Sequence, residues 1–95
     1  MRDLVLVTFC LALLSCGGTS IEEYGRVVES ARACTAGDVC VLSPAGKGCA
    51  CASAINQSQA AKVQDAYDSL DCGGAEAECA LATNPRCENN VCVAQ

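Results

Sequence analysis

The residues of this chain with the greatest capacity for chemistry are its ten cysteines. The two closest together are Cys49 and Cys51, which are separated only by Ala50. Thiolates at that spacing can ligate zinc or copper(I), and a disulfide between them would be strained and oxidising. No C-x-x-C motif supports either use, because the intervals from Cys34 onward are five, eight, one, twenty, six, seven and four residues. We therefore interpret Cys49 and Cys51 as structural cysteines with different partners.

Nucleophilic catalysis of the common kinds is excluded, because the chain contains no histidine to act as the base. The remaining acid–base candidates are two pairs of carboxylates, Glu76 with Glu78 and Asp65 with Asp68. A carboxylate pair does such work only when its surroundings separate the two pKa values. Nothing in these polar, Ala-rich stretches supplies that separation. The sequence predicts no catalytic residue, no cofactor and no metal site, and thus a protein that is not an enzyme.

The N-terminal segment has the pattern of an export signal. Residues 4–14 read LVLVTFCLALL and are almost wholly apolar. As a helix they would be about 16 Å long, roughly half the ~30 Å hydrocarbon core of a bilayer, so they are too short to span it. Arg2 and the terminal amine precede this run, and small residues follow it. We predict a secretory signal peptide over residues 1–15.

The end of this segment, Leu13-Leu14-Ser15-Cys16, resembles the lipobox of bacterial lipoproteins. The resemblance implies that Cys16 is acylated, with palmitate among its chains, and becomes the first residue of the mature protein. Leu14 is bulkier than the residue usual at that position. The number of cysteines agrees with lipidation: once Cys10 leaves with the signal and Cys16 carries lipid, an even number remains to pair. An ordinary signal peptide followed by an incidental cysteine is the alternative.

The same resemblance gives an expected location. The lipid on Cys16 would hold the protein on a membrane of the bacterial cell envelope, and residues 16–19 form only a short tether. Gly17 occupies the position where, in enteric bacteria, an aspartate marks retention in the inner membrane, so the outer membrane is favoured. The net charge of −5 and pI of about 4.4 argue against a nucleic-acid partner. The expected partners are the membrane and a protein or other component of the envelope.

The part after the signal has few large apolar side chains, and no Phe, Trp or Met remains in it. Burying one such side chain contributes ~1.5–3 kcal/mol, whereas ordering each residue costs ~1–2 kcal/mol of backbone entropy. Disulfides, at ~2–4 kcal/mol each, would make up the difference and indicate an oxidising compartment. Eight cysteines allow 105 pairings, among which the sequence does not choose. The predicted disulfide cysteines are Cys34, Cys40, Cys49, Cys51, Cys72, Cys79, Cys87 and Cys92.

Two helices are predicted. The first covers residues 20–33, where Ser20 and Glu23 form a capping box ahead of an apolar stripe. The second and longer one covers residues 55–71, where Asn56 with Gln59 resembles a capping box and an apolar stripe includes Val63. Gly73 and Gly74 would follow its end.

Short strands are predicted near residues 39–43, 79–83, 86–88 and 91–93. The last two form a hairpin whose turn is Asn89-Asn90. This places Cys87 opposite Cys92, so that the two either bond to each other or both point to the core and join the hairpin to the long helix. Cys51 and Cys72 flank the long helix and cannot bond to each other. The predicted fold is a single small disulfide-rich α+β domain, residues 20–95, with the 55–71 helix packed on a short antiparallel sheet.

Residues 34–93 also resemble small cysteine-rich lipoproteins of delta-proteobacteria such as myxobacteria. The resemblance is carried by Cys34-x5-Cys40, by the C-x-C motif with Ala54-Ile55-Asn56 after it, and by the Pro85-Arg86-Cys87-Glu88-Asn89-Asn90-Val91-Cys92 ending. It implies a fold and a location and brings no activity.

The favoured function is a non-enzymatic binding or structural module of the envelope. The alternatives are a thiol-active protein that binds metal or exchanges electrons at Cys49 and Cys51, and an inhibitor or toxin-like module that uses residues 43–48.

Overall fold

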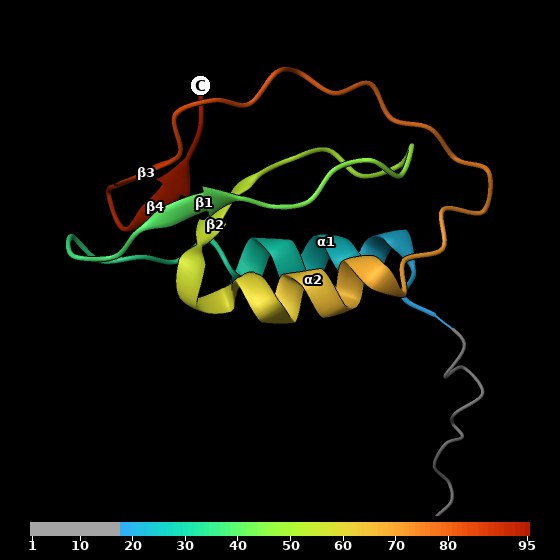
Figure 1. Cartoon of the computed structure of the whole chain (residues 1–95), viewed down its shortest axis with the longest axis horizontal. Helices are drawn as coiled ribbons and strands as arrows, with labels where there is room; N and C mark the ends of the chain where they lie inside the picture. Colours follow the sequence, from blue (N-terminus) through green and yellow to red (C-terminus); the bar gives the residue numbers. More distant parts are fainter. Residues whose placement is uncertain (1–17) are drawn as a thin grey trace, which may run out of the picture.

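The computed structural model describes residues 18–95. The predicted signal peptide and the lipobox with Cys16 lie outside this part. The described chain forms two layers, a pair of helices below and short strands with long loops above (Figure 1). No helix in residues 18–95 has the length and apolar character needed to cross a membrane. In chain order the elements are α1 (Ile21–Ser30), β1 (Cys40–Leu42), β2 (Ala54–Asn56), the 3-10 helix η3 (Gln57–Gln59), α2 (Ala60–Asp68), β3 (Arg86–Glu88) and β4 (Val91–Val93).

The predicted first helix is confirmed as α1, and its capping box is formed. The Ser20 hydroxyl accepts from the Glu23 backbone N–H at 3.1 Å, and the Glu23 carboxylate accepts from the Ser20 N–H at 3.2 Å. Two of the N–H groups that a helix start leaves unpaired are thereby satisfied. α1 packs antiparallel beside α2 (Figure 1), and Thr19 at the start of α1 bonds to the chain just after α2.

The second helix is shorter than predicted, because residues 54–56 form β2. The sequence places Ile55 in the helix, but it pairs with Val41 of β1 and is 1% exposed. The Asn56 side chain caps η3 instead, accepting from the Ser58 N–H. Pairing with β1 and burial of a β-branched side chain favour the strand over the helix start that the capping pattern predicts. α2 ends at Asp68, several residues before the left-handed Gly73 and Gly74.

The strands form two separate two-stranded antiparallel sheets, β1–β2 and β3–β4. The predicted strand at residues 79–83 is wrong, since that stretch forms no strand and β2 takes its place beside β1. The C-terminal hairpin is confirmed: Cys87 lies opposite Cys92, and Asn89 and Asn90 have φ of 53° and 67°. Asparagine tolerates this left-handed region better than most residues. The two sheets pack on each other, β4 on β2 and β3 on β1.

The core consists of two small clusters. One lies between the helices and the strands and is built on Tyr24, Ile55, Val63 and Leu70. The other lies between the two sheets and is made mainly of cysteines. Its buried residues are Cys34, Cys40, Ala54 and Cys92. The small disulfide-rich α+β fold predicted from the sequence is therefore confirmed.

Candidate functional site

Four disulfides join all eight of the predicted cysteines. They are Cys34–Cys87, Cys40–Cys92, Cys49–Cys72 and Cys51–Cys79.

Cys87 and Cys92 do not bond to each other, although they face each other across the hairpin. Their partners are Cys34, which follows α1, and Cys40 of β1. The hairpin is thus tied to the segment between α1 and β1 rather than to the long helix.

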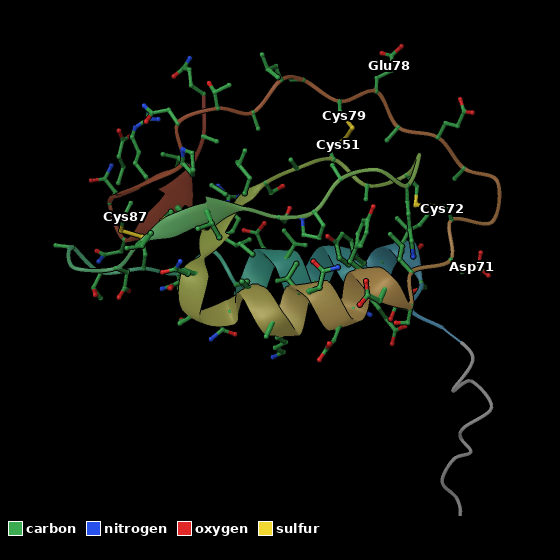
Figure 2. All side chains as sticks on the ribbon, in the orientation of Figure 1. Cys51, Asp71, Cys72, Glu78, Cys79 and Cys87 are labelled. Carbon is green, nitrogen blue, oxygen red and sulfur yellow. A yellow bond between two sulfur atoms is a disulfide. The ribbon has the colours of Figure 1, made fainter. Side chains whose placement is uncertain are left out.

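The C-x-C motif clamps the chain that follows α2, which we call the 69–85 loop. Cys49 bonds to Cys72 and Cys51 bonds to Cys79, while Ala50 between them is buried (Figure 2). Each sulfur is closed in its own disulfide, which leaves no thiolate to ligate a metal. Cys49 and Cys51 therefore have different partners, as the spacing predicts, and both act on one loop.

The sulfurs of two other disulfides lie side by side, a feature that the sequence analysis missed. The Sγ atoms of Cys34, Cys40 and Cys92 all lie within 4.8 Å of one another, and all three residues are buried. Cys87 completes the group through its bond to Cys34. We call these four residues the sulfur cluster. Only pairing between distant segments brings it together, so no spacing in the sequence signals it.

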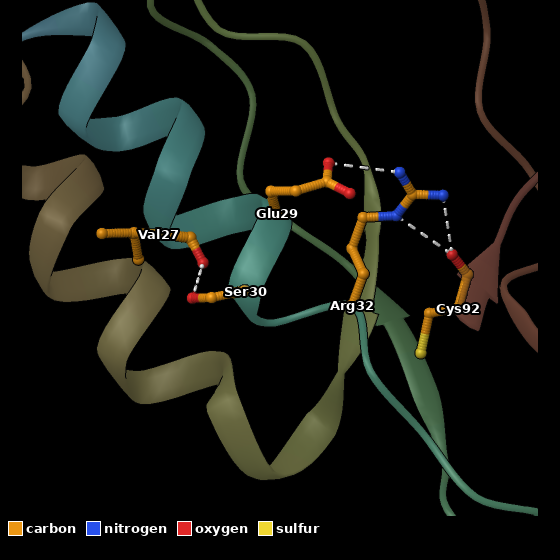
Figure 3. A network of polar contacts seen from close by, with 5 residues as sticks. All are labelled: Val27, Glu29, Ser30, Arg32 and Cys92. Atoms are coloured by element: carbon orange, nitrogen blue, oxygen red, sulfur yellow. Dashed lines mark hydrogen bonds and ion pairs between the residues drawn. The ribbon is translucent and has the colours of Figure 1, made fainter. Parts of the chain in front are cut away.

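An open cleft of about 450 Å³ lies between the segment at Cys51–Ala54, the 69–85 loop and the C-terminal residues. Arg32 forms part of its wall. Its Nε and Nη2 donate to the Cys92 carbonyl at 3.2 and 3.1 Å, and its Nη1 lies 3.4 Å from the Glu29 carboxylate (Figure 3). The guanidinium is therefore held in place by the fold. Glu78 and Leu81 contribute the loop side of the cleft, and the Leu81 side chain is 83% exposed.

A second cavity of about 330 Å³ runs along α1 and the C-x-C motif. Its lining includes Ile21, Tyr24, Gly25 and Val28. The Tyr24 hydroxyl is buried and has no hydrogen-bond partner among the described residues. Burial raises the pKa of Tyr24, because the ionised phenolate would lose its solvation.

The carboxylates considered for acid–base chemistry all lie on the surface. Asp65, Asp68, Glu76 and Glu78 are exposed, and the Asp68 carboxylate accepts from Gln64 at 2.8 Å. The structure does not bring these acids into an enclosed site.

A different carboxylate, that of Asp38, connects two segments of the fold through hydrogen bonds. The backbone N–H of Thr35 and the side-chain amide of Asn56 donate to its carboxylate, and these bonds lower the pKa of Asp38.

Residues 43–48, considered for an inhibitory role, are fastened to α2. Lys47 Nζ donates to the carbonyls of Tyr67, Asp68 and Leu70 at 2.6, 3.3 and 3.0 Å. The Lys47 backbone N–H also donates to the Tyr67 hydroxyl at 2.8 Å, and the ammonium lies 5.0 Å from the centre of the Tyr67 ring. The Lys47 ammonium group is thus engaged within the protein, where it donates hydrogen bonds to carbonyl groups that the end of α2 leaves unpaired.

Comparison of the chain with protein-family models, with curated proteins and with solved structures found no significant match.

Proposed function

We propose that this protein is a non-enzymatic binding module of the bacterial cell envelope, anchored to a membrane by lipid on Cys16. Its four disulfides support a stable scaffold on a small core, as in exported proteins. The proposed binding surface is the cleft beside the 69–85 loop. Its proposed ligand is an extended peptide segment of an envelope protein.

The observation that carries this proposal is that the loop backbone at residues 78–82 is left without backbone hydrogen-bond partners within residues 18–95. This stretch makes no backbone–backbone hydrogen bond to any other described residue, yet it borders the cleft. The Cys51–Cys79 disulfide fixes it near its start, and the paired backbone bonds of Thr83 with Gln95, at 2.9 and 2.8 Å, fix the chain just after it. Loops longer than ~12–15 residues without regular structure are usually either functional or disordered. Because a disulfide and backbone hydrogen bonds hold the 69–85 loop in place, the functional alternative is favoured.

The chemistry of the cleft suits a peptide backbone. Free N–H and C=O groups along an extended stretch can add a strand from a partner, while neighbouring side chains select the sequence. Leu81 offers one apolar contact for the ligand, and Glu78 offers a negative charge at the rim.

Selection from a displayed library of random peptides against the purified protein tests the cleft. Bound peptides should shift the NMR amide signals of residues 78–82 more than those of α1. Replacing Leu81→Ser should weaken binding roughly 10- to 150-fold, because a lost leucine contact is worth ~1.5–3 kcal/mol. Val39→Ser is the matched control, since Val39 is also exposed, at 56%, and does not line the cleft. Equal losses in both variants, or shifts confined to α1, would refute the site.

The anchor is tested separately. Intact mass under non-reducing conditions should show acyl chains on Cys16 and four disulfides, and Cys16→Ser should move the protein from the membrane fraction to the soluble fraction. A wild-type protein without acyl mass would overturn the anchoring while leaving the cleft to its own test.

A further inference from the structure

The sulfur cluster has an asymmetric exposure that matters for thiol chemistry. Cys40 and Cys92 are 7% and 0% exposed, so an external thiol cannot reach their disulfide directly. Cys34 is also buried, at 5%, but its partner Cys87 is only partly buried. The Cys34–Cys87 disulfide therefore has one accessible end and one end directed at a second disulfide. Cys87 is labelled in Figure 2, at the edge of the β3–β4 hairpin.

Hydrogen bonds hold these segments together independently of the disulfides. The Cys34 N–H donates to the Asn90 carbonyl at 3.1 Å, and the Asn90 side-chain amide donates to the Cys34 carbonyl at 3.2 Å. The Cys92 N–H donates to the Arg32 carbonyl at 2.7 Å, and the Arg32 guanidinium binds the Cys92 carbonyl in return (Figure 3). Opening the Cys34–Cys87 bond therefore leaves Cys34 beside Cys40 and Cys92.

From this geometry we infer that the sulfur cluster is a thiol–disulfide exchange relay whose entry point is Cys87. It lies away from the Cys49–Cys51 motif that the sequence suggests for redox chemistry, and it does not depend on the proposed binding cleft or anchor. Its substrate class is an external thiolate, from a small thiol or from a cysteine of another protein.

The first step is attack of that thiolate on Cys87 Sγ. A bond forms between the external sulfur and Cys87 Sγ, the Cys34–Cys87 bond breaks, and its electron pair leaves on Cys34 as a thiolate. In the second step Cys34 Sγ attacks Cys40 Sγ or Cys92 Sγ, which lie within 4.8 Å. A disulfide from Cys34 to one of them forms, the Cys40–Cys92 bond breaks, and the other sulfur leaves as a thiolate and takes up a proton. The number of disulfides is unchanged in this step.

The relay gives a reductant at the surface access to a buried disulfide that it cannot touch. The hairpin loses its bond to Cys34 in the first step. In the second step it either exchanges its Cys40–Cys92 bond for a Cys34–Cys92 bond or, where Cys34 bonds to Cys40, loses its remaining disulfide.

Partial reduction of the wild-type protein tests the relay. Free thiols are first blocked with N-ethylmaleimide, and the protein is then exposed briefly to glutathione at mildly alkaline pH. Acid quenching, isotopically labelled N-ethylmaleimide and peptide mapping follow. Cleavage after acidic residues, among them Asp38, Glu78 and Glu88, places the four cysteines of the cluster on different peptides. The expected product has glutathione or label on Cys87 and a new disulfide from Cys34 to Cys40 or Cys92. Recovery of Cys34 and Cys87 labelled together, with Cys40–Cys92 always intact, would overturn the inference.

Two further arms separate the relay from general scrambling. A phosphine at acid pH opens a disulfide, and the thiolate that it releases is protonated at once, so this reagent should yield no new linkage. The Cys87→Ser variant should contain, without any reductant, a mixture of linkages among Cys34, Cys40 and Cys92. Cys79→Ser is the matched control, because it frees Cys51, and the described residues contain no other group of three sulfurs this close. A Cys87→Ser protein with only the native Cys40–Cys92 bond would refute the relay, and the wild-type mapping decides the question if the variant does not fold.

Discussion

Replacing Lys47→Met removes the ammonium group and keeps the length of the side chain. Lys47 Nζ donates to three carbonyl oxygens at the end of α2, those of Tyr67, Asp68 and Leu70. We expect the substitution to lower the stability of the protein by loosening two elements together, the end of α2 and the loop at residues 43–48.

The size of the loss follows from these contacts. A hydrogen bond that involves a charged group contributes ~1.5–3 kcal/mol, and a cation at a helix C-terminus adds ~0.3–1 kcal/mol. These carbonyls are partly exposed, and water replaces part of the interaction once the ammonium is gone. We therefore expect the free energy of unfolding to fall by about 2 kcal/mol, which is on the order of 8–16 °C in melting temperature for a domain of this size.

Thermal unfolding followed by circular dichroism, with the disulfides intact, measures the loss. Lys62→Met is the matched control, because Lys62 lies on the exposed face of α2 and makes none of the hydrogen bonds or ion pairs found in residues 18–95. Its melting temperature should stay close to that of the wild type. If Lys47→Met and Lys62→Met melt at the same temperature, the reasoning that the lysine caps the helix is refuted.

Two further predictions concern β2. One changes Ile55 in this strand, and the other changes Asp38, whose carboxylate accepts a hydrogen bond from Asn56 of β2. Ile55→Ala should cost about 2–5 kcal/mol in unfolding free energy, since the Ile55 side chain is fully buried and leaves a cavity; a loss below that of an exposed substitution would contradict its place in the core. Asp38→Asn should reduce the sensitivity of the protein to acid. The folded-state pKa of Asp38 is lowered from 3.8, so its contribution to stability is present above that pH and is lost as the pH falls through the folded pKa. Melting temperatures measured at pH values below about 4 should fall more steeply for the wild type than for the variant, and parallel curves would contradict the role of the Thr35 and Asn56 bonds.

Much of the local structure could be predicted because its causes lie within a few residues. The capping box of Ser20 and Glu23 starts α1, and Asn89 and Asn90 provide the left-handed turn of the hairpin. The twenty residues between Cys51 and Cys72 correctly excluded a bond between them.

The errors occurred where a distant partner outweighed the local pattern. Asn56 and Gln59 read as a helix start, but Ile55 pairs with Val41 and makes this stretch a strand. Residues 79–83 read as a strand, but they border a cleft and make no strand pairing. Strand pairing depends on which segments meet in space, and the residues of one segment do not reveal its partner.

By itself the sequence determined that the described domain is small, poor in large apolar side chains and dependent on crosslinks, because composition alone limits how much surface can be buried. Only the tertiary structure decided which cysteines pair, which loop the C-x-C motif clamps and which sulfurs lie beside one another. These disulfides join residues that are 23 to 53 positions apart. Contacts over such separations are selected by the packing of the whole chain, whereas periodicity, caps and turns act only between near neighbours.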